Sequence, residues 1–259
     1  MTSDEAATDV PPLRRRRRAV AVQEIVTAAE RHLTEHGPAA MSLRAVARSL
    51  GMTVQALYHY FPSRDHLVTT LIAKAYDDLA DAVQGAVDAA PDRTTVPRVV
   101  LAAEGYRRWA MVNPERFQLI YGTPLRHYEA PAEGPTTQAV RRMSAIFMRE
   151  LFGEFSTEQL AAADTPEPSP SFRAHLEHLP PDGLGALPPP AVSLFLDAWG
   201  RMHGLVALEV FGHTTFIGAH QAEVFHVAMR NMCRDVHRRI PADRTGLREA
   251  GDARQASRP

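Results

Sequence analysis

The sequence predicts an all-helical protein. Apolar residues recur every three or four positions in several separate segments, which is the spacing of a helix with one buried face. No segment shows the strict alternation of apolar and polar residues that is typical of a half-buried strand. The chain has 259 residues, of which 45% are hydrophobic. That is enough for a packed core, in one large domain or in two smaller ones.

Changes in composition and periodicity divide the chain into four segments. Residues 1–18 are polar and then basic, and we expect them to form a disordered arm. Residues 19–64 are expected to fold as a three-helix head, and residues 65–240 as a larger helical domain. Residues 241–259 are polar again, and we expect a disordered tail.

The head should contain one long and two short helices. In the first, apolar residues at helical spacing begin at Val22 and end at Leu33, before the break at Gly37-Pro38. The two short helices lie between residues 42 and 61. Ser63 is then placed to cap a long helix that runs from Arg64 to about residue 85.

The larger domain should contain several amphipathic helices separated by proline-rich loops. Asn113-Pro114-Glu115 is a strong helix start, with a cap residue, a proline at the first position and an early acid. Ser156 and Gln159 form a candidate capping box for one brief helix in a segment, 156–190, that is otherwise expected to be loop. The helices are expected over residues 96–111, 114–121, 136–152, 191–211 and 221–239, with a further loop at 123–135.

Charge is distributed unevenly, although the net charge is only −1. Residues 14–64 hold nine arginines against three glutamates, while the rest of the chain is mildly acidic. A basic front on an acidic body is typical of a nucleic-acid-binding head. The unbroken run Arg14–Arg18 has two open interpretations: an arm that reaches a DNA backbone or minor groove, or a solvated tail.

The segment from Ser42 to Phe61 has the pattern of a helix-turn-helix. Ala47 is small enough for two helices to cross closely, and Gly51 can end the first helix in the left-handed conformation. Ser42 and Thr53 stand where helix caps are needed. The helix that follows Thr53 is short, as suits an element inserted into a major groove about 12 Å wide. The apolar residues expected to fix the pair to the first helix are Val46, Leu50, Met52, Leu57 and Tyr60. The pattern therefore predicts DNA binding.

The run Leu57-Tyr-His-Tyr-Phe-Pro-Ser-Arg-Asp-His-Leu67 resembles the signature of the TetR family of bacterial regulators, and the likeness extends over residues 20–72. Arg64 stands where family members usually carry lysine. The resemblance implies two sets of DNA contacts. The expected phosphate contacts are Ser42, Thr53, Tyr58 and Arg64. The expected base-edge contacts are Arg44 (guanine), Gln55 (adenine), Val54 (a thymine methyl) and His59.

The second half of the chain resembles TetR-like C-terminal domains that contain a Trp-His-Gly motif. The likeness rests on Asn113–Phe117 and on Trp199–Leu205, in which Met202 replaces the tryptophan of the motif. It implies a homodimer formed by the last two helices and a pocket for an unidentified small-molecule effector. Candidate pocket residues, each of which also suits an ordinary core position, are Trp109, Phe117, Tyr121, Met143, Phe147, Trp199 and His203.

Several other kinds of protein lack support in the sequence. The single cysteine, Cys233, permits no disulfide within the chain and fits a reducing compartment. We see neither an apolar run long enough to span a membrane nor a secretory signal, so a cytoplasmic location is expected. We find no catalytic motif, and we expect no enzyme activity, cofactor or metal site. His175 and His178 have a metal-ligand spacing but lie in a proline-rich loop without a cysteine nearby.

The sequence thus predicts a DNA-binding transcriptional regulator. By resemblance, we expect a repressor that binds a palindromic operator as a homodimer and is released by a ligand. The alternatives are a ligand-independent architectural DNA-binding protein, a transcriptional activator, or a helical enzyme or carrier that uses the C-terminal pocket. The sequence does not distinguish repression from activation, and it displays no clustered acid–base pair of the kind that the enzyme alternative would need.

Overall fold

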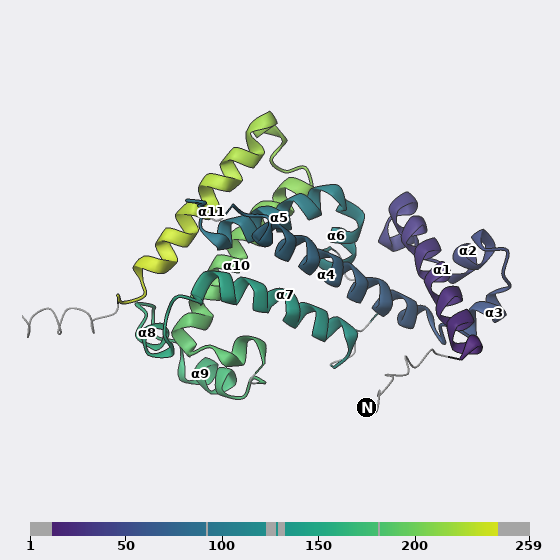
Figure 1. Cartoon of the computed structure of the whole chain (residues 1–259), viewed down its shortest axis with the longest axis horizontal. Coiled ribbons are helices and arrows are strands. Elements are labelled where there is room, and N and C mark those ends of the chain that lie inside the picture. Colours follow the sequence, from purple (N-terminus) through teal and green to yellow (C-terminus); the bar gives the residue numbers. More distant parts are fainter. Residues whose placement is uncertain (1–11, 92, 123–127, 129–132, 181, 243–259) are drawn as a thin grey trace, which may run out of the picture. The chain divides into compact units, whose positions relative to one another are not determined.

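The computed structural model describes residues 12–91, 93–122, 128, 133–180 and 182–242. These residues form helices joined by turns and contain no strand, which confirms the all-helical class (Figure 1). The chain divides into two compact units. Residues up to 76 and residues 113–138 make the first unit, and residues 77–112 and 139–259 make the second. Within the described part, no helix has the length and hydropathy needed to cross a bilayer.

The first unit is a small helical head. Helix α1 packs against α2, α6 and the short η1, and α2 packs against α3. Ile25, Val46, Leu57 and Phe117 are completely buried in its core. Its elements are α1 (Leu13–His36), η1 (Pro38–Ala40), α2 (Leu43–Ser49), α3 (Val54–Tyr58), the first half of α4 (Arg64–Asp88) and α6 (Pro114–Tyr121).

Helix α1 begins at Leu13, nine residues before the predicted start at Val22. The backbone N–H groups of Arg15 and Arg16 donate to the carbonyl oxygen of Pro12 at 2.8 and 3.2 Å, which closes the first turn. Arginine is a strong helix former, so a helix can include the run although it offers no apolar periodicity. The predicted arm is therefore wrong from Leu13 onward. Residues 1–11, and residues 243–259 of the predicted tail, lie outside the described residues.

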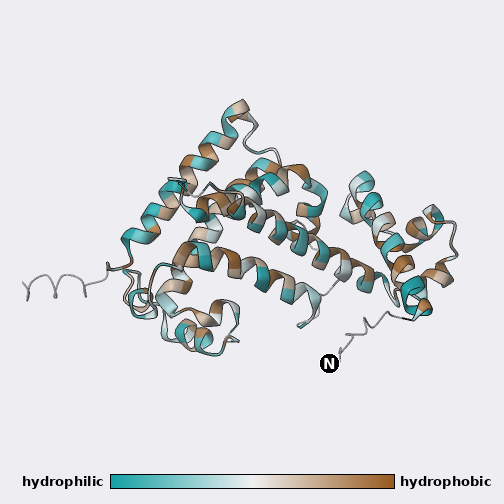
Figure 2. Cartoon of the chain, in the orientation of Figure 1, coloured by the Kyte–Doolittle hydropathy of each residue, from teal (hydrophilic) through white to brown (hydrophobic). Residues whose placement is uncertain are grey.

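The second unit is built around α10 and α11. Helix α10 packs against α5, α8 and α11, and α11 packs against α5. Helices of this unit carry hydrophobic residues on one side and hydrophilic residues on the other (Figure 2). Besides the second half of α4, its elements are α5 (Arg98–Val112), most of α7 (Pro135–Phe152), α8 (Thr157–Ala161), α9 (Pro170–Glu177), η2 (Gly183–Ala186), α10 (Pro189–Val210), η3 (Thr215–His220) and α11 (Gln221–Arg238).

The segment 156–190 contains more helix than the sequence predicted. The capping box at the start of α8 is confirmed, with the Ser156 hydroxyl accepting from the backbone N–H of Gln159 and the Gln159 side chain accepting from the backbone N–H of Ser156. A second helix, α9, was missed. The Ser169 hydroxyl caps it by accepting from the N–H of Phe172 at 3.3 Å, and Pro170 occupies its first position. Pro170 in α9, and Pro189 and Pro190 in α10, therefore lie at helix starts, where no backbone N–H is needed.

Two side-chain pairs join α5 to the last two helices. Both guanidinium nitrogens Nε and Nη2 of Arg107 donate to the carboxylate of Glu209 in α10, the first at 2.7 Å. The Glu209 side chain is only 5% exposed, so its charge relies on this partner. Nearby, Nδ1 of His226 in α11 lies 2.5 Å from a carboxylate oxygen of Glu104. These pairs fix α5 against α10 and α11.

Candidate DNA-binding interface

The turn between α2 and α3 has the geometry of a helix-turn-helix. Gly51 has a φ of 65°, in the left-handed region where a side chain would strain the backbone. The N–H of Gly51 donates to the carbonyl of Arg48 at 3.1 Å, and the N–H of Met52 donates to that of Ala47 at 2.9 Å. This pair of bonds is the Schellman arrangement that ends a helix at glycine. Ala47 is completely buried, as the close crossing requires.

The helix caps agree with the sequence at two of three positions. The N–H of Ala56 donates to the Thr53 hydroxyl at 3.1 Å, which caps α3. The N–H of His66 donates to the Ser63 hydroxyl at 3.2 Å at the start of α4. Ser42 has the extended backbone of a cap residue before α2, but its hydroxyl makes no cap hydrogen bond among the described residues. The Ser42 hydroxyl is therefore not engaged in capping, which is compatible with the expected phosphate contact.

The predicted DNA contacts lie on α2, on α3 and at the start of α4. Tyr58 is 42% exposed, so its ring and hydroxyl are accessible to a partner. Arg64 is half-buried, and its Nε donates to the Met41 carbonyl at 3.4 Å, so only part of its guanidinium remains for a phosphate. The exposed members are Arg44, Thr53, Gln55, Tyr58 and His59, and the half-buried ones are Ser42, Val54 and Arg64.

One contact to α3 was not foreseen. Arg18, near the start of α1, donates from Nη1 to the carbonyl oxygen of His59 at 3.1 Å. Its guanidinium also lies 5.3 Å from the ring centroid of Tyr60. Because no spacing rule relates residues 41 positions apart, only the arginine run itself could have drawn attention to this residue. Arg18 thus connects the first turns of α1 to the C-terminal end of α3. As the second helix of the helix-turn-helix, α3 is the recognition helix, the one expected to enter the major groove.

The second unit contains an aromatic cluster formed by Tyr106, Phe147, Trp199 and His203. The Trp199 and His203 rings are stacked at 8°, with centroids 5.5 Å apart, and the Tyr106 ring meets Trp199 edge-on at 5.7 Å. The Tyr106 hydroxyl and Nδ1 of His203 are hydrogen-bonded at 2.8 Å. Burial lowers the pKa of His203. Burial therefore favours the neutral imidazole, and in the tautomer with a free Nδ1 lone pair this atom accepts a hydrogen bond from the tyrosine hydroxyl.

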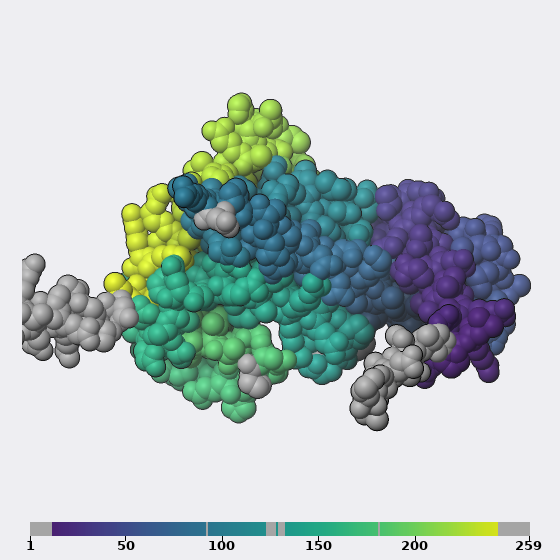
Figure 3. Space-filling view, viewed as in Figure 1, coloured from purple at the N-terminus to yellow at the C-terminus, as the bar shows by residue number. Residues whose placement is uncertain are grey.

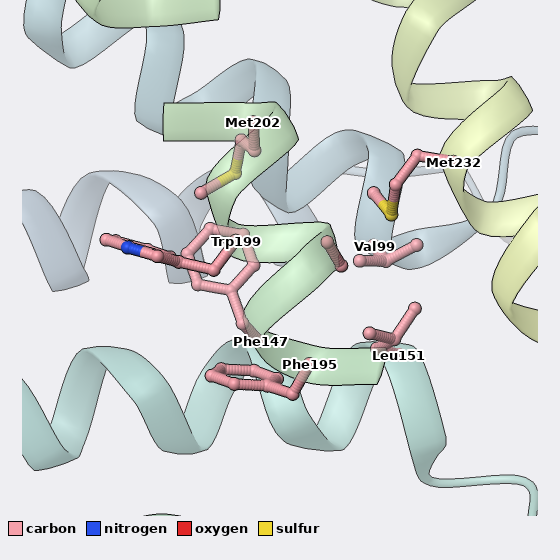
Figure 4. Close-up of a pocket in the computed structure, with 8 residues that line it drawn as sticks. Val99, Phe147, Leu151, Phe195, Trp199, Met202 and Met232 are labelled. Atoms are coloured by element: carbon pink, nitrogen blue, oxygen red, sulfur yellow. The ribbon is translucent and has the colours of Figure 1, made fainter. Parts of the chain in front are cut away.

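An apolar cavity of about 20 Å³ lies beside this cluster (Figure 4). Trp199 and Phe147 belong to its wall together with Met202 of α10 and Met232 of α11. A space of this size holds one water molecule, whereas small-molecule pockets occupy about 300–1,000 Å³. The complete lining is Val99, Phe147, Leu151, Phe195, Ala198, Trp199, Met202 and Met232.

The candidate pocket residues are divided between the two units. Phe147 and Trp199 line the cavity, and His203 stacks on Trp199. Trp109 and Met143 are buried in the second unit but do not belong to that lining. Phe117 and Tyr121 belong to the first unit, where their rings lie 5.1 Å apart. Sequence reasoning missed Tyr106, whose hydroxyl gives the cluster its polar contact.

Comparison with known proteins agrees with this geometry. Residues 25–71 match the family "Bacterial regulatory proteins, tetR family", and residues 99–232 match "Tetracyclin repressor-like, C-terminal domain". The chain is 36% identical over 189 residues to the HTH-type transcriptional regulators Rv1816 of Mycobacterium tuberculosis and Mb1846 of Mycobacterium bovis. Each alignment covers 73% of this chain and 80% of the relative.

Solved structures show the same fold. The crystal structure of SCO4313, assigned as a regulatory protein, is 30% identical, with a TM-score of 0.67, and the match covers 86% of this chain and 98% of that one. A TetR-family regulator from Streptomyces coelicolor shares the fold at 16% identity and a TM-score of 0.51, covering 93% of this chain and 99% of that one. With both the head and the larger domain matched, the chain belongs to the TetR family of DNA-binding transcriptional regulators.

Proposed function

We propose that the protein is a repressor that binds a palindromic operator as a homodimer and is released by a small apolar ligand. The observation that carries the proposal is the length of the recognition helix, since α3 has only five residues. One such helix contacts a few base pairs. Two copies related by a two-fold axis, about 34 Å apart, can read one palindrome and reach useful specificity.

The surface of α10 and α11 supports the homodimer. Leu196 and Leu208 of α10 are 43% and 44% exposed, and Val224 and Val227 of α11 are 44% and 51% exposed. Gly200 and Gly204 lie between the two leucines at four-residue spacing, and a Cβ atom on either would meet nothing within 4 Å. Exposed apolar side chains on two helices that pack together are candidates for an interaction site. We propose that a second copy of the chain covers it.

The cavity beside Trp199 supports the choice of ligand class. Its lining is aliphatic, aromatic and thioether, which favours an apolar ligand. Because the cavity measures only about 20 Å³, binding requires that it enlarge. Met202 and Met232 are flexible side chains that can move to make room. The Tyr106–His203 pair supplies a polar contact on the adjoining cluster and can orient a ligand hydroxyl or carbonyl.

Helix α4 supports the link between ligand and DNA. It contributes residues 64–76 to the first unit and residues 77–88 to the second. In the proposed mechanism, a ligand favours a conformation in which α4 is displaced and the two recognition helices no longer fit successive half-sites. Changing the ratio of the DNA-binding to the released conformation from 99:1 to 1:99 requires a ligand that binds the released conformation about 10⁴-fold more tightly.

The proposal is tested by footprinting the intergenic region beside the protein's own gene, with and without candidate apolar metabolites. We expect a protected palindrome whose protection is lost when the active metabolite is added, and in vitro transcription that rises at the same concentration. Protection that no metabolite changes would point instead to an architectural protein. Transcription that falls on release would point to an activator.

Ligand entry beside Trp199 should be visible in fluorescence. The chain has two tryptophans, so Trp109→Phe leaves Trp199 as the single reporter. We expect the emission of this variant to change in intensity on addition of the metabolite, with a midpoint equal to that of operator release. The converse variant, Trp199→Phe, keeps the reporter that does not line the cavity and is the control. Equal responses from the two variants would contradict the assignment of the cavity.

Arg44 is proposed to read one guanine. Its side chain is exposed on α2, and a guanidinium can donate two hydrogen bonds to the O6 and N7 atoms of that base. We expect Arg44→Ala to weaken operator binding by about 1–3 kcal/mol and to relax specificity at one position of each half-site. Binding to a panel of singly substituted operators measures both effects. An equal loss on operator and random duplexes would assign Arg44 to the backbone instead.

A further inference from the structure

The first turns of α1 form a dense positive surface on the first unit. In Figure 3, α1 (dark purple) lies on the surface of this unit, and in Figure 2 its start is strongly hydrophilic. Arg14–Arg18 are all exposed. Within the part of the chain that the structure describes, Arg14–Arg17 have no ion-pair partner. Four charges held together without counterions repel one another, and they favour an anionic partner.

The arginines do not share one direction. Successive residues of a helix are rotated by about 100°, so Arg14, Arg15 and Arg18 fall within an arc of about 100°. Ile25 and Ala29, which are completely buried, fall inside the same arc further along α1. These three arginines thus extend the face by which α1 packs on the rest of the first unit. Arg16 lies about 160° away from Arg18, on the opposite side.

The contacts of Arg18 identify the element on which this face of α1 packs. Its hydrogen bond to the His59 carbonyl and its position over the Tyr60 ring place this side of α1 against the C-terminal end of α3. Arg14 and Arg15 precede Arg18 by one turn, about 6 Å along the axis. They therefore extend past the end of the recognition helix, on the side of α1 that faces it.

We infer that Arg14 and Arg15 form a second phosphate-binding surface, which contacts the DNA backbone that borders the groove entered by α3. Arg18 is the positioning residue that sets the register between this surface and the recognition helix. Guanidinium groups suit this role because they bind phosphate oxygens in a bidentate manner. The inference uses the DNA binding of the family and is independent of the proposed effector.

The test compares two variants of the full-length protein that each remove two charges from α1. Arg14→Gln/Arg15→Gln changes the proposed surface. Arg16→Gln/Arg31→Gln changes exposed positions on the opposite side of the helix. Glutamine preserves helix propensity, so both variants should unfold at the wild-type temperature. The probe is a fluorescein-labelled duplex that the wild-type protein selects from a randomised pool, and binding is measured by anisotropy over a range of NaCl concentrations.

We expect the first variant to make the slope of log K against log[salt] shallower by about 2 for each bound protomer, as the loss of two phosphate contacts requires. The second variant should keep the wild-type slope. Hydroxyl-radical footprints of the first variant should lose protection over one backbone segment in each half-site and keep the rest. Equal flattening by both variants would reveal a diffuse charge effect, and an unchanged slope for the first would reveal a solvated surface; either overturns the inference.

Discussion

Replacing Glu209 with alanine is expected to lower the free energy of unfolding by about 3–5 kcal/mol, because it leaves the Arg107 guanidinium without its counterion in a buried position. The Arg107 side chain is 17% exposed and the Glu209 side chain 5%, so water compensates little. The guanidinium also lies 5.9 Å from the Phe225 ring centroid, which holds it in an apolar setting. Urea unfolding, followed by circular dichroism at a fixed protein concentration, measures the loss.

Arg201 provides the matched control for this prediction. It also pairs with acidic residues of α10 and α11, Asp197 and Asp235, but all three side chains are at least 40% exposed. Exposed pairs contribute about 0–1 kcal/mol, so Arg201→Ala should have a small effect.

A double variant separates an unpaired charge from lost packing. Replacing Arg107 and Glu209 together by leucine removes both charges, and it should recover most of the stability, because a buried ion pair and a hydrophobic pair of similar volume are often nearly equivalent. A double variant as unstable as Glu209→Ala would show that the loss comes from packing around α5 and not from an unpaired guanidinium.

The sequence was most informative where function depends on local geometry. The turn of the helix-turn-helix requires a residue without a Cβ at Gly51 and a small one at Ala47, and both requirements can be read in the chain. The capping box at Ser156 and the cap at Thr53 are equally local, since each involves atoms three residues apart. Such features specify which side chains can face the DNA before any tertiary contact is known.

Contacts between residues that are far apart in the chain could not be predicted from the sequence. Arg107 and Glu209 are 102 positions apart, and neither residue signals the other. The helical start of α1 could not be predicted for another reason. Apolar periodicity reveals a helix by its buried face, and all five arginines of the run are exposed. Helix α9 was missed although its start, Ser169-Pro170, carries a cap residue followed by proline at the first position. In this segment the abundance of proline favours a loop, whereas the position of each proline relative to a cap residue favours a helix start.

Replacing Val227 with aspartate is expected to convert the protein to a monomer and to weaken operator binding by about 10³-fold or more. Val227 is 51% exposed on α11, one turn from Val224, on the surface that we propose a second copy covers. In a dimer with two-fold symmetry the substitution buries two carboxylates in an apolar contact, without a partner for either. A monomer must bind each half-site separately, and so it retains little more than non-specific affinity.

The matched control is Ala222→Asp, which adds the same charge to the same helix. Residue 222 is exposed and lies about 140° around α11 from Val227, so its side chain should stay in water. Sedimentation velocity and operator binding, measured on both variants, distinguish the possible outcomes. Val227→Asp as a dimer would place the interface elsewhere. Val227→Asp as a monomer with wild-type operator affinity would show that one five-residue recognition helix suffices for operator binding, and it would contradict the proposed homodimer.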